Sequence, residues 1–289
     1  MSVRSKENVF SKVLKVYRVK SWIKNLGIPL LAFLLNNENN ISMLLSVLAH
    51  ESLLFAHAFS INDFFDFKLM NENNYISNQI KKGESEVKYL ILTILPLLPA
   101  LVFTLFLPTS VLIFSFLFVL FFDSYSCPPT RLKRHWFPSF LINPVAISTL
   151  PFLTVYFLFS NTLTTQALLF LIIFFAYILS SEILHQIAHR KKDKKGKIQS
   201  FPNIYGIKNS LKLFQAIQVF LALISVYFLF TDFFSHSFLL LTIFFSLLRI
   251  VKIRNINIRR TNFEKIRNEI YGMQEGICYL VWLLIFNLA

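Results

Sequence analysis

Residues 163–183 have the sequence LTTQALLFLIIFFAYILSSEI, which is uncharged until Glu182 and almost wholly apolar in its middle. An apolar helix of about 20 residues is long enough to cross the hydrocarbon core of a bilayer. From Glu182 the chain continues EILHQIAHRKKDKK, so the composition changes within a few turns from apolar to polar and basic. This change predicts a membrane helix whose end carries polar and charged side chains.

Similar apolar runs recur along the chain and predict an all-α membrane protein. Of the 289 residues, 55% are hydrophobic and only 15% are charged. Backbone groups in lipid must be paired within their own segment, which favours helices. Runs such as LLLTIFFSLL do not alternate as the strands of a membrane barrel do. We predict a single domain, residues 1–289, with nine transmembrane helices at 22–35, 41–61, 88–106, 109–122, 137–160, 163–183, 211–231, 234–248 and 270–288.

The net charge of +14 would suggest a nucleic-acid partner in a soluble protein. Here all 29 Lys and Arg residues lie in the first 24 residues, in the loops after the second, fourth, sixth and eighth spans, or, for Lys88 and Lys212, at the start of the span that follows such a loop. With nine spans these regions share one side, which the positive-inside rule makes cytoplasmic. We expect no nucleic-acid partner but an integral membrane protein, in a bacterium one of the cytoplasmic (inner) membrane. Its basic N-terminal segment, 1–21, and the motif loops would be cytoplasmic and its C-terminus outside.

The second predicted span ends in a polar cluster, residues 60–66, with the sequence SINDFFD. Asn62 and Asp66 are four residues apart and share a helix face, with Asp63 on its flank. Carboxylates at a helix end suit Mg²⁺, which binds a few carboxylates together with substrate phosphate oxygens. The alternative is an ordinary polar helix end at the membrane surface.

A second polar cluster closes the sixth span on one continuing helix face. It contains Glu182, His185, Gln186, His189 and Asp193. Two histidines and a carboxylate would suit zinc. Equally, the two carboxylates would suit Mg²⁺, with amide and imidazole groups in support. The third interpretation is a solvated basic loop.

The third cluster follows the fourth span at residues 125–133, with the sequence YSCPPTRLK. Two prolines stiffen this turn. Arg131 and Lys133 could bind an anionic group. An ordinary basic cytoplasmic loop is the alternative.

Taken together, these segments resemble the UbiA superfamily of intramembrane prenyltransferases, and the resemblance covers nearly the whole chain. Residues 62–66 are similar to the start of that family's NDxxDxxxD motif, and residues 125–133 to its YSxPPxRLK segment. Residues 182–187, EILHQI, stand where its second Asp-rich motif begins. Residues 18–25, RVKSWIKN, resemble the approach to its first helix.

The resemblance implies a UbiA-type bundle of nine helices around a lipid-accessible cavity. It also implies Mg²⁺-assisted transfer of a prenyl or polyprenyl group from an isoprenoid diphosphate to an aromatic or other lipophilic acceptor, with membrane lipid as the surroundings. Carried onto this chain, the catalytic residues would be Asp63, Asp66 and Asp193. The metal ligands would be these three with Asn62 and Gln186. The substrate contacts would be Lys24, Asn25, Tyr125, Arg131, Lys133, Glu182, His185 and His189.

This chain departs from the family pattern at three positions. Met70 stands where the first motif has its third Asp, and Gln186 and His189 stand where the second motif has acidic residues. A UbiA-type enzyme with changed chemistry is therefore an alternative, either a terpene cyclase or a phosphoribosyl transferase acting on polyprenyl phosphate. A non-catalytic family member is another. A transporter is disfavoured, because the polar clusters lie at helix ends and not near the bilayer midplane.

The predicted orientation can be tested with single cysteines in a variant that carries Cys127→Ser and Cys278→Ser. We expect Lys194→Cys to react with a membrane-impermeant thiol reagent only after the membrane is opened, because its loop is cytoplasmic. Asn161→Cys should react in intact spheroplasts. The reverse pattern of labelling would show that the basic loops lie outside.

Overall fold

The computed structural model describes residues 8–36, 40–230, 236–254, 256 and 262–271. Within these residues the regular structure is entirely helical, so the all-α prediction is confirmed. The elements in chain order are α1 (Val9–Val16), α2 (Val19–Trp22), η1 (Ile23–Leu26), α3 (Gly27–Leu35), α4 (Ile41–Met70), α5 (Tyr75–Ile80), α6 (Glu86–Ile94), α7 (Leu97–Thr104), α8 (Thr109–Ser126), η2 (Leu132–Arg134), α9 (Trp136–Pro144), η3 (Val145–Thr149), α10 (Leu150–Phe159), α11 (Thr165–Lys195), α12 (Phe201–Leu229), α13 (His236–Arg254) and α14 (Phe263–Ile270).

In the described part of the chain, six helical stretches are long and apolar enough to cross a membrane. They are Ile41–Met70, Glu86–Thr104, Thr109–Ser126, Trp136–Phe159, Thr165–Lys195 and Phe201–Leu229. Helices also occupy most of the predicted spans 22–35 and 234–248, as α2 to α3 and as α13. The predicted span 270–288 lies almost entirely outside the described residues. The membrane class is thus supported, while the number nine stays a prediction.

The two helices that carry the polar motifs are longer than their predicted spans. Helix α4 continues to Met70 and α11 to Lys195, past the predicted ends at residues 61 and 183. Both extensions carry several good helix formers, so polar composition alone does not stop the helix. The motif residues therefore stand on helices and not on loops, and their spacing sets which of them share a face.

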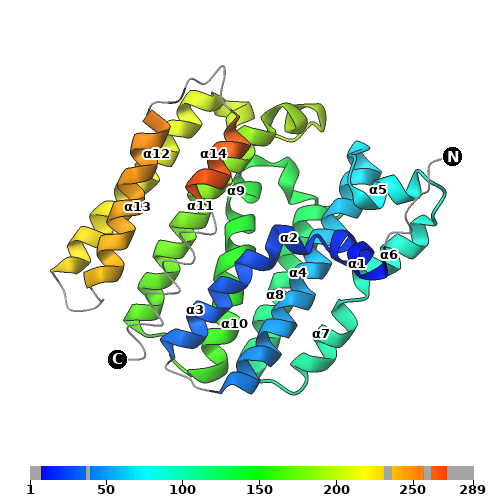
Figure 1. Ribbon diagram of the computed structural model, residues 1–289, viewed down its shortest axis with the longest axis horizontal. Coiled ribbons are helices and arrows are strands. Elements are labelled where there is room, and N and C mark those ends of the chain that lie inside the picture. The colour runs from blue at the N-terminus through cyan, green and yellow to red at the C-terminus, as the bar shows by residue number, and fades with distance from the viewer. Residues whose placement is uncertain (1–7, 37–39, 231–235, 255, 257–261, 272–289) are drawn as a thin grey trace.

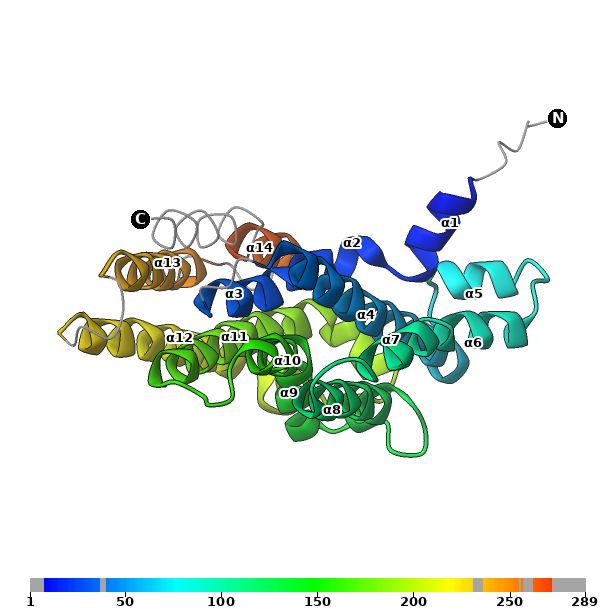
Figure 2. The ribbon, with the colours of Figure 1, turned by 90° about the horizontal axis from the view of Figure 1, so that it is seen from below.

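The helices lie side by side, and Figure 1 shows α11, α12 and α13 running next to one another at one end of the molecule. Helix α12 packs on both α11 and α13, and α10 packs on both α3 and α8. Helix α4 packs on α6, α7 and α8. Figure 2 shows α1 projecting away from this helical body.

Large apolar side chains cover much of the outer surface. Phe116, Leu223 and Tyr227 are 63%, 63% and 64% exposed. Soluble monomers rarely expose contiguous apolar patches of large size. Outer faces of this kind are expected where helices contact lipid.

Two buried histidines on α4 pair with the neighbouring helices inside the bundle. The His57 Nε2 atom lies 3.0 Å from Asp123 Oδ1 on α8, and its Nδ1 atom lies 2.8 Å from the Thr93 carbonyl on α6. His50 Nε2 lies 2.9 Å from Ser115 Oγ on α8. These pairs tie the middle of α4 to α6 and α8.

Helix α12 is interrupted at Gly206, whose φ of 80° and ψ of 162° are not helical. Only glycine adopts this region of backbone conformation readily. The break sets the short segment 201–205 apart from the rest of α12. In that segment Phe201 and Tyr205 pack against Trp136 of α9.

We expect Gly206→Ala to destabilise the fold by about 1–3 kcal/mol, because a Cβ strains this backbone conformation although no neighbour lies within 4 Å. Gly27→Ala is the matched control, since Gly27 has a helical φ of −60° and equally open surroundings. It should stabilise by about 0.5–1 kcal/mol. Thermal unfolding in detergent measures both, and equal midpoints for the two variants would contradict the break at Gly206.

Candidate active site

A cavity of about 510 Å³ lies at the polar end of α4 and α11. Further walls come from the segment 18–25, α8, η2, α9, η3 and α14. Every predicted site residue except Asp63 and Arg131 lines it: Lys24, Asn25, Asn62, Asp66, Tyr125, Lys133, Glu182, His185, Gln186, His189 and Asp193. Residues far apart in sequence are thus brought to one place because α4 and α11 present their polar ends to the same space.

Asp66 is the centre of the hydrogen bonds on the α4 side. Lys133 Nζ forms an ion pair with Asp66 Oδ1, and Arg131 Nη2 lies 3.5 Å from the same oxygen. Asn62 Nδ2 donates to Asp66 Oδ2 at 3.2 Å. Asn62 Oδ1 in turn accepts from Lys133 Nζ at 2.8 Å and from Ser126 Oγ at 3.0 Å. One carboxylate therefore organises α4, α8 and η2 around itself.

The two basic residues beside Asp66 are nearly inaccessible to solvent. Arg131 is 2% exposed and Lys133 is 5% exposed. Burial lowers the pKa of the Lys133 ammonium, and the neighbouring Asp66 carboxylate opposes that shift. Among the described residues, Arg131 Nε and Nη1 have no hydrogen-bond partner. Buried guanidinium groups with unused N–H donors favour an anion such as a phosphate.

Asp63 faces a different partner and does not line the cavity. Arg18 Nη1 donates to Asp63 Oδ1 at 2.8 Å. Arg18 has the left-handed φ of 51° at the start of α2 and does line the cavity. The motif carboxylate thus holds a basic residue at the cavity wall, a role that the spacing on α4 does not reveal.

On the α11 side, Gln186 links three elements. Its Nε2 atom donates to Glu182 Oε1 at 3.2 Å and to Ser139 Oγ of α9 at 3.4 Å. Its Oε1 atom accepts from the Phe201 amide at the start of α12 at 3.1 Å. Glu182 Oε2 accepts from Asn143 Nδ2 at 2.7 Å. In the structure the Gln186 oxygen therefore caps a helix, and metal ligation by it would have to compete with that bond.

The two histidines of α11 lie together, with their ring centroids 4.4 Å apart. Arg267 Nη1 on α14 lies 2.8 Å from His185 Nδ1. Because a guanidinium can only donate, His185 Nδ1 is the acceptor and its proton lies on Nε2. Zinc ligation through His185 Nδ1 is therefore blocked by Arg267.

Helix α14 covers the cavity and was not predicted as part of the site. Asn262 caps its start by accepting from the Glu264 and Lys265 amides at 3.1 and 3.2 Å. Phe263 and Ile270 are buried against α11, which leaves the polar face of the helix on the cavity. That face consists of Glu264, Arg267 and Asn268. The cap and the amphipathic pattern could have indicated a helix, but not the surface on which it lies.

Away from the charged end, the cavity wall becomes apolar. Ala58 and Phe59 of α4, Phe122 of α8, Ile147 and Ile178 form this part. Tyr125 lies where the two parts meet, with Lys133 Nζ 5.9 Å from its ring centroid. The site can therefore hold a ligand with an anionic head and an apolar tail.

The donor chemistry of the cavity fits a hard divalent cation that is held together with a phosphate. Within the described residues, no three Asp, Glu, His or Cys side chains form a ready-made metal site. Mg²⁺ usually binds one or two carboxylates and completes its shell with phosphate oxygens and water. Asp66 of α4 and Asp193 of α11 supply such carboxylates from two different helices. In addition, Glu72 Oε2 is buried in the wall and lacks a hydrogen-bond partner in the described structure.

Comparison with known proteins gives one family. The model of the UbiA prenyltransferase family matches residues 26–267. A search of curated proteins finds no match.

Solved structures share this arrangement of helices. A UbiA homolog from Archaeoglobus fulgidus bound to GPP and Mg²⁺ is 17% identical with a TM-score of 0.71, covering 93% of this chain and 99% of its own. The same homolog bound to DMAPP and Mg²⁺ has the same identity and TM-score, with 93% and 98% covered. A digeranylgeranylglyceryl phosphate synthase in membranes is 20% identical, with a TM-score of 0.71 and 96% and 97% covered. At these identities the likeness establishes the fold.

The ion pair between Lys133 and Asp66 predicts a strong coupling of the two residues. Lys133→Met should cost about 3 kcal/mol of stability, because it leaves the buried Asp66 carboxylate with only the neutral Asn62 amide and the longer contact to Arg131. Adding Asp66→Asn should recover much of that loss. Lys68→Met is the control, since Lys68 pairs with Glu86 at 2.5 Å on the exposed surface and should change stability by at most about 1 kcal/mol. Strictly additive losses in unfolding experiments would contradict the coupling.

Proposed function

The chain belongs to the UbiA prenyltransferase family, and on that premise we propose that it transfers a prenyl or polyprenyl group from an isoprenoid diphosphate to an aromatic or other lipophilic acceptor within the membrane. One observation carries this proposal. A single cavity joins a cation- and carboxylate-lined end to an apolar, aromatic part. GPP and DMAPP, which the solved homolog binds with Mg²⁺, have this same two-part chemistry and support a prenyl diphosphate as the donor.

The basic residues would stabilise the leaving diphosphate. Ionisation of an allylic diphosphate develops negative charge on the departing group, and fixed cations in a site that excludes water stabilise such charge strongly. Lys24 and Lys133 line the cavity, and Arg131 contacts Asp66 while its Nε and Nη1 atoms have no hydrogen-bond partner in the described part of the chain. We assign these three residues to the diphosphate. Asn25, beside Lys24 on the wall, is assigned to the same group.

A divalent cation, Mg²⁺ by analogy with the solved homolog, would neutralise the diphosphate when bound. Asp66 and Asp193 would hold it from the two sides of the cavity, with Asn62 and Gln186 in support. Asp63 would act through Arg18, which it positions at the wall. The role of Asp63 is therefore proposed to be positioning and not direct ligation.

Aromatic side chains would stabilise the allylic cation and exclude water from it. A cation over an aromatic ring gains up to about 2 kcal/mol in a desolvated site. Phe59, Phe122 and Tyr125 line the part of the cavity next to the charged end. Glu182, His185 and His189 line the cavity from α11, where they would contact the substrates.

In cells we propose the predicted orientation, with the motif ends of α4 and α11 on the cytoplasmic side of the membrane.

The decisive assay incubates purified full-length protein in detergent with Mg²⁺ and radiolabelled prenyl diphosphates of several lengths, with and without a lipid extract as acceptor pool. We expect diphosphate release and a labelled lipid adduct. Asp66→Asn and Asp193→Asn should lower the rate at least about 100-fold, because each removes a carboxylate that would hold the divalent cation on the leaving group. Removal of the metal with EDTA should have an effect at least as large.

Glu84→Gln is the matched control, because Glu84 is an exposed carboxylate that pairs with Lys88 at 2.6 Å outside the cavity. It should keep wild-type activity. If the labelled product is a cyclic hydrocarbon or alcohol and not an adduct, the protein is a cyclase and the proposal of prenyl transfer is overturned. A failure to release diphosphate from any donor, with Asp66→Asn binding the donors as the wild type does, would overturn the catalytic proposal.

A further inference from the structure

The first motif loses a carboxylate at Met70, and the structure shows what this position does instead. Met70 is the last residue of α4 and packs against Gly196 at the end of α11. A Cβ at position 196 would come so close to the Met70 sulfur that the Met70 side chain would have to move. Met70 is thus an apolar contact between the two motif helices. Since Asp63 faces Arg18, Asp66 is the one Asp of α4 on the cavity wall.

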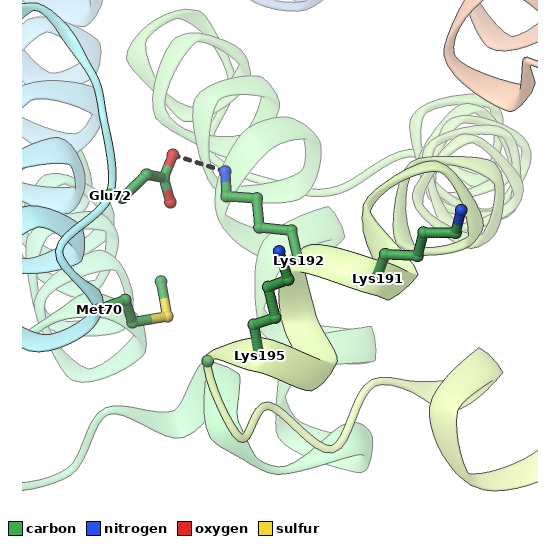
Figure 3. Close-up of a pocket in the computed structure, with 6 residues that line it drawn as sticks. Met70, Glu72, Lys191, Lys192 and Lys195 are labelled. Carbon is green, nitrogen blue, oxygen red and sulfur yellow. Dashed lines mark hydrogen bonds and ion pairs between the residues drawn. The ribbon is translucent and has the colours of Figure 1, made fainter.

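Two residues later the chain brings another carboxylate back to the cavity. Asn71 ends α4 with a left-handed φ of 50°, and the Glu72 amide donates to the Asp66 carbonyl at 3.3 Å. This turn reverses the chain over the helix end. Glu72 consequently lines both the main cavity and an adjoining pocket of about 380 Å³. In Figure 3 the side chains of Glu72 and Met70 both point toward the lysine-bearing end of α11.

The two oxygens of Glu72 have different surroundings. Oε1 accepts from Lys192 Nζ of α11 at 2.5 Å, the contact drawn in Figure 3. Oε2 is buried and has no hydrogen-bond partner among the described residues. A buried carboxylate oxygen that lacks a partner keeps the full cost of its desolvation. The position of Oε2 at the cavity wall therefore favours a positively charged ligand there.

We infer that Glu72 replaces the carboxylate missing at Met70 and, with Asp66 and Asp193, faces the divalent cation on a bound prenyl diphosphate. Lys192 holds the other oxygen and so fixes the direction of the carboxylate. This inference rests on the proposed function. The competing interpretation is that Glu72 and Lys192 form only a structural ion pair between the ends of α4 and α11.

The test measures metal binding and not turnover. The full-length protein in detergent is saturated with geranyl thiodiphosphate, a donor analogue that ionises poorly, and titrated with Mn²⁺ followed by electron paramagnetic resonance. Mn²⁺ accepts the same oxygen ligands as Mg²⁺. Glu72→Gln should weaken Mn²⁺ binding at least about tenfold. Met70→Asp in the Glu72→Gln background should restore most of the affinity, because it returns a carboxylate to the motif.

Two further variants separate ligation from a structural ion pair. Lys192→Gln keeps the carboxylate but frees its direction, so it should weaken Mn²⁺ binding clearly less than Glu72→Gln does. An equal loss in the two variants would overturn the inference. Glu86→Gln removes an exposed ion pair with Lys68 outside the cavity and should match the wild type. If Glu72→Gln binds Mn²⁺ as tightly as the wild type does, the inference about Glu72 is overturned and the proposed function is not affected. A wild-type protein that does not bind the analogue overturns the proposed function and this inference together.

Discussion

The low dielectric of the bilayer is the constraint on which this structure depends. Charged side chains are costly inside a membrane, so they gather where a helix leaves it. In this chain the helices α4 and α11 extend past the apolar core and carry Asp63, Asp66, Glu182 and Asp193 on their polar ends. Both helices present these ends to one cavity. The need to keep charged side chains out of the lipid therefore also gathers them around a single site.

Within the site, the carboxylates are balanced by basic residues from other elements. Asp66 pairs with Lys133 and Arg131, and Asp63 pairs with Arg18. Pairing of this kind offsets the cost of desolvating each charge. It also means that the fold already positions these basic residues, with the Nε and Nη1 atoms of Arg131 unpaired among the described residues. The carboxylates therefore organise the basic residues even before any role as metal ligands.

The departures from the family motifs occur where the two motif helices meet. Met70 packs on Gly196, and the Lys192 amine reaches Glu72 across the same junction. His189 lies beside His185, which accepts a hydrogen bond from Arg267 of α14. The polar end of α11 is thus bound to α14 by this hydrogen bond. The family's Asp-rich motifs do not include such a contact. Residues outside the motifs, Arg18 and Glu264 among them, complete the wall.

Local sequence patterns were sufficient to predict much of the secondary structure of this protein. The apolar runs determined its helices and its membrane class, and the spacing of Asn62 and Asp66 determined their common face on α4. Only the tertiary structure decided which charges meet, because Arg18 and Asp63 or Arg267 and His185 are brought together by the packing of separate helices. It also decided that the Gln186 oxygen caps α12 and that Glu72 turns back over α4 at Asn71. Periodicity follows from the geometry of one helix, whereas these contacts depend on how several helices pack in space.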